Sequence, residues 1–289
     1  MTDWLSLTRR ASFASHQLIG WIFWDPTAKA NLEALGVPGG IGHYIVNRGA
    51  PLCPAGPEAL FAAFYTIHRD FVHGAWNHTA RHTTDWHAVS RARDNAVLAG
   101  LERMTPGVIG PLGELADALW NVVDTIPSSG RVLFAAHKSW PRPDNPALGA
   151  WNALNALREW RGDTHFGILV SEDIGVVEAG LLHDAWMGYP KEWIPRSRGA
   201  NDDQIAAAVT ALERRGWATD GVVNTAGIEF RQWLEEETNR LCARCWETFG
   251  AENTETFLAL IEPVGHRFVE HIDATAGPNW MPAARPRRV

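Results

Sequence analysis

Apolar residues recur at intervals of three and four along most of this chain, which is the spacing of helices with one buried face. In the first half, the pattern predicts helices over residues 8–23, 41–48, 57–71, 83–104 and 114–126. Asp85 stands where the fourth of these helices would begin, and an aspartate there is suited to cap it. Glycines and prolines separate the segments.

A helix in the middle of the chain is predicted to end at a glycine. Residues 151–160 have helical spacing, and Gly162 is placed as the C-cap of that helix. Asp163 or Thr164 would then cap a second helix that continues through residue 170.

The elements after this point follow a recognisable order. They are a turn at residues 172–175, helices over 176–186 and 202–217, a hairpin at Asp220-Gly221 and a helix over 228–250. Asp-Gly between two β-prone runs is a strong hairpin signal. Two short helices joined by a tight turn indicate a helix-turn-helix, and a helix, a hairpin and a helix in sequence indicate a winged helix.

These patterns predict a mainly α fold in two domains. A proline-rich stretch ends near residue 146 and separates an N-terminal helical domain, residues 1–146, from a C-terminal winged-helix-like domain, residues 147–270. The second domain would hold the helix-turn-helix and the small β-hairpin. Residues 271–289 are expected to form a tail, with the final stretch PAARPRRV, residues 282–289, mobile.

Composition and charge narrow the range of partners. A chain of 289 residues with 46% hydrophobic and 20% charged residues is ordinary for a globular protein. Its net charge of −7 disfavours binding to DNA, because nucleic-acid affinity comes mostly from lysine and arginine. The N-terminus is too polar for a signal peptide, and no apolar run approaches the roughly 18 residues of a membrane helix. We therefore expect a soluble, cytoplasmic protein that makes no membrane contact.

Tryptophan is the unusual residue of this chain, which has fifteen. An indole ring supplies a large apolar area with one hydrogen-bond donor, which suits cores and pocket walls alike. Any single tryptophan is best explained as a core residue. Fifteen together favour an aromatic-lined cavity for an aromatic or apolar small molecule.

The segment LREWRGDTHFGIL, residues 157–169, places charges where the flanking pattern points into a core. Arg158 and Arg161 lie three apart and are candidates to hold a ligand carboxylate or phosphate. Asp163 and His165 are the candidate catalytic groups, since both can transfer protons. The structural alternatives are an internal salt bridge for the arginines, an N-cap for Asp163 and a hydrogen-bonded core residue for His165.

A second group of polar side chains lies in the N-terminal half. Tyr44 and Arg48 are four apart, and Tyr65 and His68 are three apart, each pair on an otherwise apolar helix. Buried polar groups need partners, so these four are candidate ligand-binding residues across a cavity from the segment 157–169. The alternative is that each one hydrogen-bonds a backbone carbonyl.

No motif in the sequence indicates a particular metal or cofactor. His78 and His82 have the spacing of one helical face, but no glutamate follows the first as in zinc proteases. Cys242 and Cys245 form a lone C-x-x-C inside a predicted helix, which favours packing; with Cys53 they are expected to be reduced. Haem needs only one histidine in such a cavity, so the cofactor stays unknown.

Several segments carry a resemblance to a known family. They are WDPTAKANLEALGV, YIVNRGAPL, GRVLFAAHKSWPRPDNP with the residues 151–169 that follow it, and LERRGWATDGVVNTAGIEFRQWLEEETNRL. Together they resemble an actinobacterial family described only as helix-turn-helix proteins. The resemblance implies a mostly helical fold with a winged-helix-like part, and no defined reaction. Asn152 and Trp160 stand where the family pattern has histidines, which suggests a pocket suited to an aromatic or apolar ligand, with Trp160 in its wall.

Two classes of function agree with these patterns. The first is a small-molecule-binding protein, with catalysis undecided because no nucleophile is paired with a base. The second is a ligand-responsive winged-helix transcription factor, although the helix over 202–217 begins with two aspartates and residues 218–227 hold no cation. A haem- or cofactor-dependent enzyme is a further alternative. A homodimer through the winged-helix domain is compatible with each of them.

Overall fold

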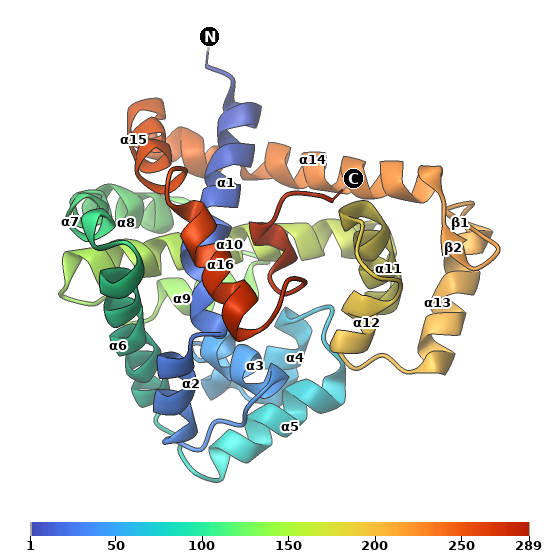
Figure 1. The fold of residues 1–289 in the computed structure, drawn as a ribbon, viewed down its shortest axis with the longest axis horizontal. Helices are drawn as coiled ribbons and strands as arrows, with labels where there is room; N and C mark the ends of the chain where they lie inside the picture. The colour runs from blue at the N-terminus through green and yellow to red at the C-terminus, as the bar shows by residue number, and fades with distance from the viewer. Residues whose placement is uncertain (1, 289) are drawn as a thin grey trace.

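Helices make up most of the structure, as the sequence predicts. The computed structural model describes residues 2–288, and this range contains sixteen α-helices and one two-stranded hairpin (Figure 1). The helices of the first half are α1 (Trp4–Gly20), α2 (Pro26–Glu33), α3 (Ile41–Gly49), α4 (Pro57–Ala63), α5 (Arg69–Ala80), α6 (Trp86–Met104), α7 (Pro106–Glu114), α8 (Ala116–Thr125) and α9 (Val132–Lys138). Those of the second half are α10 (Pro146–Ser171), α11 (Val176–Met187), α12 (Trp193–Ser197), α13 (Asp202–Arg214), α14 (Thr225–Phe249), α15 (Ala251–Ile261) and α16 (Gly265–Thr275). The strands β1 (Ala218–Thr219) and β2 (Val222–Val223) lie between α13 and α14.

The longest helix, α10, runs through the middle of the molecule (Figure 1). Every residue from Ala147 to Trp160 except Asn152 is buried, as in a helix that is surrounded by others. It packs against α7, α8 and α9, and also against α1 and α14. The predicted domain boundary at residue 146 falls at the start of this helix, and the division there stays a prediction.

The prediction that Gly162 ends a helix is wrong, because α10 continues without a break to Ser171. Asp163 therefore caps no following helix. Its carboxylate instead accepts a hydrogen bond of 2.9 Å from the backbone amide of Phe134, in the first turn of α9. A glycine inside a helix costs about 1 kcal/mol, and the packing of α10 among its neighbours offsets that cost.

The prediction of a single helix over residues 57–71 is also wrong. α4 ends at Ala63 and α5 begins at Arg69, and between them Tyr65 has a backbone φ of 32°. The Tyr65 hydroxyl donates to the carbonyl of Ile174, and its ring stacks on Phe166 at a centroid distance of 5.4 Å. These distant partners, which no local pattern reveals, fix the turn that interrupts the helix.

The region from α11 to α14 has the predicted order of elements, with the short, unpredicted helix α12 between α11 and α13. α13 begins with a capping box made by Asn201 and Gln204. Asp220 and Gly221, with φ values of 50° and 78°, form the predicted turn between β1 and β2, where a tight hairpin needs positive φ. α11 packs against α12, α13 and α14, which joins this region to the centre of the molecule.

The C-terminal segment after α16 returns to the centre of the structure, and the sequence did not reveal this path (Figure 1). The segment 276–288 contains a short 3-10 turn, Pro282–Ala284, that packs on α1. Met281 lies so close to Gly20 that a Cβ atom there would be 2.7 Å from its Cε, so a larger residue at position 20 would displace the methionine side chain. The backbone amide of Arg288 donates to the carbonyl of Met187 at 3.1 Å, which links the segment to α11.

Candidate functional site

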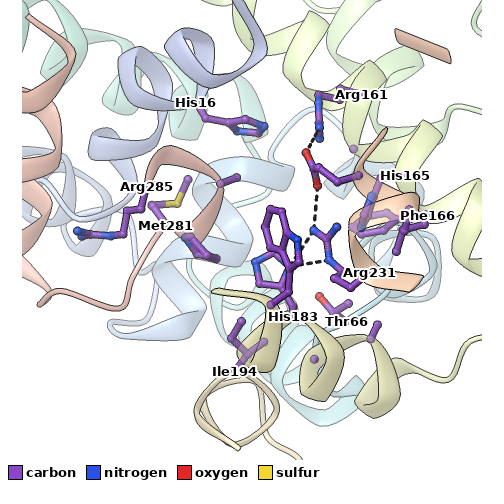
Figure 2. Close-up of a pocket in the computed structure, with 18 of the residues that line it drawn as sticks. His16, Thr66, Arg161, His165, Phe166, His183, Ile194, Arg231, Met281 and Arg285 are labelled. Carbon is purple, nitrogen blue, oxygen red and sulfur yellow. Dashed lines mark hydrogen bonds and ion pairs between the residues drawn. The ribbon is translucent and has the colours of Figure 1, made fainter. Parts of the chain in front are cut away.

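A cavity of about 440 Å³ lies where the N-terminal helices, α10, α11, α14 and the C-terminal segment meet (Figure 2). Its apolar wall is largely aromatic and contains Phe13, Trp24, Phe64, Phe166, Trp186, Trp193 and Trp280. The turn between α4 and α5 contributes Thr66 and Ile67, and the loop after α12 contributes Arg198. The turn between α4 and α5 and the loop after α12 thus both bring side chains to the cavity.

One face of α10 supplies the polar wall. Arg158, Arg161 and His165 are spaced by three and four residues, so they share a face of the continuous helix, and all three line the cavity. α14 faces them with Arg231 and Glu235, which are four apart. The unbroken course of α10 is what keeps its three side chains aligned.

Glu235 lies between two arginines in a chain of ion pairs (Figure 2). Arg161 donates to one oxygen of Glu235 and, at 3.0 Å, to the amide oxygen of Asn239. Arg231 donates to the other carboxylate oxygen at 2.9 Å. Burial alone would raise the pKa of Glu235, but Arg161 and Arg231 outweigh it and hold that pKa well below its usual range.

His183 on α11 extends this chain. Its Nδ1 accepts hydrogen bonds from Nε and Nη2 of Arg231 at 3.2 and 3.0 Å (Figure 2). A neutral ring that accepts at Nδ1 carries its proton on Nε2, and this atom is buried without a partner among the described residues. Burial and the neighbouring Arg231 hold the pKa of His183 well below its usual value, so the ring is neutral at pH 7.

His165 is held in the opposite tautomer. The Thr238 hydroxyl donates to the carbonyl of Leu234 at 2.7 Å, so its oxygen can only accept from Nδ1 of His165, 3.0 Å away. This leaves Nε2 of His165 as an acceptor. Burial and Arg231 lower its pKa to about 3. Because α10 is continuous through residue 171, His165 lies inside a helix and not just after the predicted cap at Asp163 or Thr164.

Glu159 balances a second pair of arginines. Its fully buried carboxylate accepts from Nε and Nη2 of Arg48 at 2.9 and 2.6 Å, and also from Arg158. Arg48 donates to the Tyr44 hydroxyl at 3.2 Å. Burial opposes ionisation of Glu159, but the two guanidiniums outweigh it and lower its pKa to about 2.

Of the site residues predicted from sequence, five line the cavity, namely Tyr44, Arg48, Arg158, Arg161 and His165. The structural alternative of an internal salt bridge also applies to Arg48, Arg158 and Arg161, since each pairs with a glutamate. The same three side chains therefore both line the cavity and form ion pairs.

The other four predicted residues lie outside the cavity lining. Trp160 is a core residue whose indole nitrogen donates to the carbonyl of Pro127 at 3.0 Å. Tyr65 bonds the Ile174 carbonyl, and His68 caps α5 by accepting from the amide of Asp70 at 3.3 Å. The Asp163 carboxylate accepts a hydrogen bond from a backbone amide in the first turn of α9, and burial raises the pKa of Asp163 to about 7.

The sequence reasoning missed several residues of the polar wall, namely His16, His183, Arg198, Arg231, Glu235 and Asn239. A signal for Arg231 was present in the sequence. It falls on the buried stripe of α14 that contains Gly227, Leu234, Thr238 and Cys242, at spacings of three and four. A charged residue inside such a stripe needs a buried partner, which marks it as a site candidate.

Comparison with known proteins supports the helical fold and the resemblance drawn from the sequence. Residues 8–275 match a family described as a helix-turn-helix family. Searches among curated proteins and solved structures give no match. Within residues 2–288, no helix is long and apolar enough to cross a membrane, and no three histidine, cysteine or acidic side chains gather as a metal site. With nearly its whole length matched, the chain belongs to this helix-turn-helix family.

Proposed function

We propose that this chain binds a small molecule with an aromatic or apolar body in the central cavity. The observation that carries this proposal is a cavity of about 440 Å³ with aromatic walls and buried polar atoms that lack partners. Ligand sites typically have volumes of about 300–1,000 Å³, apolar walls and a few convergent polar groups. The cavity has all three properties.

The polar atoms without partners support a ligand. Among the described residues they include Nη1 of Arg231, Nε of Arg161, Nε2 of His183 and both ring nitrogens of His16. A buried donor or acceptor left without a partner costs about 1–3 kcal/mol. A ligand or ordered water that bonds to these atoms would offset that cost, and a wall of such atoms gives a ligand its orientation.

The geometry supports binding more directly than catalysis. His165 and His183 are neutral and could exchange protons with a ligand. No serine, cysteine or threonine in the lining is hydrogen-bonded to either ring in the manner of an activated nucleophile. Asp163, the other catalytic candidate, contacts α9 instead.

A second candidate function is a ligand-responsive regulator, favoured by the family description. α11 places His183 and Trp186 in the cavity and packs against α13, so a ligand could shift the helix-turn-helix region. The exposed face of α13 begins with Asp202 and Asp203, which disfavours contact with phosphates. We expect no retention of promoter DNA at about 150 mM salt, and nanomolar, sequence-dependent retention would favour the regulator.

Intrinsic tryptophan fluorescence tests the proposed binding. Titration with a panel of aromatic and apolar metabolites should give saturable quenching by at least one compound at micromolar concentration, which corresponds to about 8 kcal/mol. Trp24, Trp186, Trp193 and Trp280 line the cavity, so a ligand there lies beside several indoles. The same compound should raise the melting temperature, because it binds only the folded state. A panel that produces neither quenching nor a thermal shift would count against the proposal.

A further inference from the structure

Positive charge exceeds negative charge around the cavity. Five of its lining arginines are buried or half-buried: Arg48, Arg158 and Arg231 are buried, and Arg161 and Arg198 are half-buried. Only two carboxylates contact them within 4.0 Å among the described residues, namely Glu159 and Glu235. Each of these carboxylates is shared by two guanidiniums, so each group of one carboxylate and two arginines keeps a net positive charge.

The other carboxyl groups near the cavity do not remove this excess. The carboxyl groups of Asp163 and Asp184 accept hydrogen bonds from the backbone amides of Phe134 and Ile194, respectively. Burial raises the pKa of each carboxyl group to about 7. Even if both were fully ionised, these five guanidiniums would outnumber the four carboxylates by one. A buried charge that is not compensated costs several kcal/mol.

Arg198 is the arginine without an acidic partner. Its Nη1 donates to the Thr66 hydroxyl, and no carboxylate of residues 2–288 lies within 4.0 Å of its guanidinium. Its backbone is fixed, because the carbonyl of Arg198 accepts from the amide of His68 at 2.9 Å. Thr66 and Arg198 both line the cavity, which places this guanidinium at the ligand space.

We infer that the ligand carries an anionic group, a carboxylate or a phosphate monoester, which binds between Arg198 and Arg231. This inference rests on the proposed function and names the chemical class of the ligand. Arg231 and His183 both line the cavity, and the buried Nη1 of Arg231 and Nε2–H of His183 have no partner among the described residues. Guanidinium groups bind planar carboxylates and phosphates through paired hydrogen bonds. The aromatic wall takes the apolar body of the same molecule.

Matched ligand pairs test the charge requirement in the unmodified chain. The probes are 2-naphthoate with its neutral analogue 2-naphthamide, and 2-naphthyl phosphate with neutral 2-naphthol. Kd values come from tryptophan fluorescence titration and calorimetry at pH 7. At least one anion should bind about tenfold or more tightly than its neutral partner, the effect of one charged hydrogen bond. The two pairs separate a carboxylate site from a phosphate site.

Variants then locate the anion. Arg198→Met should raise the Kd of the preferred anion by about tenfold and change the Kd of its neutral analogue less than about twofold. Arg240→Met is the matched control, because Arg240 is exposed on α14, pairs with Glu237 and lies outside the cavity lining. Thermal melting verifies that both variants are folded.

The outcomes separate this inference from the proposed function. If the neutral probes bind as tightly as the anions, or if Arg198→Met weakens both members of a pair equally, the anionic requirement is wrong while cavity binding stands. If none of the four probes binds, the proposed site itself fails together with the inference.

Discussion

Replacing Glu159 by glutamine is expected to lower the free energy of unfolding by about 3–5 kcal/mol, the cost of removing one partner from a buried ion pair. The glutamine has the same shape but no charge. Arg48 and Arg158, which are 7% and 6% exposed, would then face each other without a carboxylate between them. Urea unfolding at pH 7 with linear extrapolation measures the change.

Glu237→Gln provides the control for this experiment. Glu237 pairs with Arg240 on the exposed side of α14, where the loss of an ion pair costs at most about 1 kcal/mol. Similar, small changes in both variants would mean that water reaches the Glu159 carboxylate and that its arginines are not enclosed.

A fall in pH from 7 to 5 is expected to destabilise the protein by several kcal/mol. Burial is the main cause that lowers the pKa of His43 and of His137 to about 4. Below pH 6.5 the unfolded chain binds protons at these rings, and the folded chain does not until about pH 4. The two neutral rings therefore make their full contribution to the free energy of unfolding above pH 6.5. This contribution is lost as the pH falls toward 4, by about 3 kcal/mol for each ring over the whole window.

The buried carboxyl groups oppose this trend only in part. Asp163 and Asp184, with pKa values raised to about 7, hold protons in the folded chain that the unfolded chain releases above about pH 4. Their contribution to stability rises as the pH falls. His16, His165 and His183 also have lowered pKa values, so the histidines outnumber these carboxyls.

Urea unfolding at pH 7, 6 and 5 checks the pH dependence. His137 donates from Nε2 to the carbonyl of Arg48 at 3.1 Å, and His137→Gln retains a donor in a similar position without a group that titrates. The slope of stability against pH should become shallower in this variant. Equal or greater stability at pH 5 in the unmodified chain would contradict the assignment of neutral, enclosed histidines.

Local signals in the sequence predicted the hairpin and the helices α1, α3, α6, α8, α11, α13 and α14. The Asp85 cap of α6 and the Asp220-Gly221 turn depend on residues adjacent in the chain, and both predictions are confirmed. Gly162 gave a misleading signal, since a glycine is equally able to end a helix or to lie inside a buried one. Only the helices packed around α10 decide between these two, and they come from distant parts of the chain.

The candidate site was predictable where its residues share one helix. Arg158, Arg161 and His165 were found because their spacing and charge stand out within an apolar segment. Arg198 was missed because nothing in its neighbourhood marks it. Its place at the cavity depends on contacts with Thr66 and His68 in the turn between α4 and α5, which are products of tertiary packing.

A crystal structure of the protein with 2-naphthoate or 2-naphthyl phosphate, whichever binds more tightly, would show whether an anionic aromatic molecule occupies the cavity. We expect the naphthalene ring between the aromatic walls near Trp24 and Trp186, and the anionic group within hydrogen-bond distance of Arg198 or Arg231. A cavity that contains only water at saturating probe concentration, with the probe bound elsewhere on the protein, would contradict this expectation.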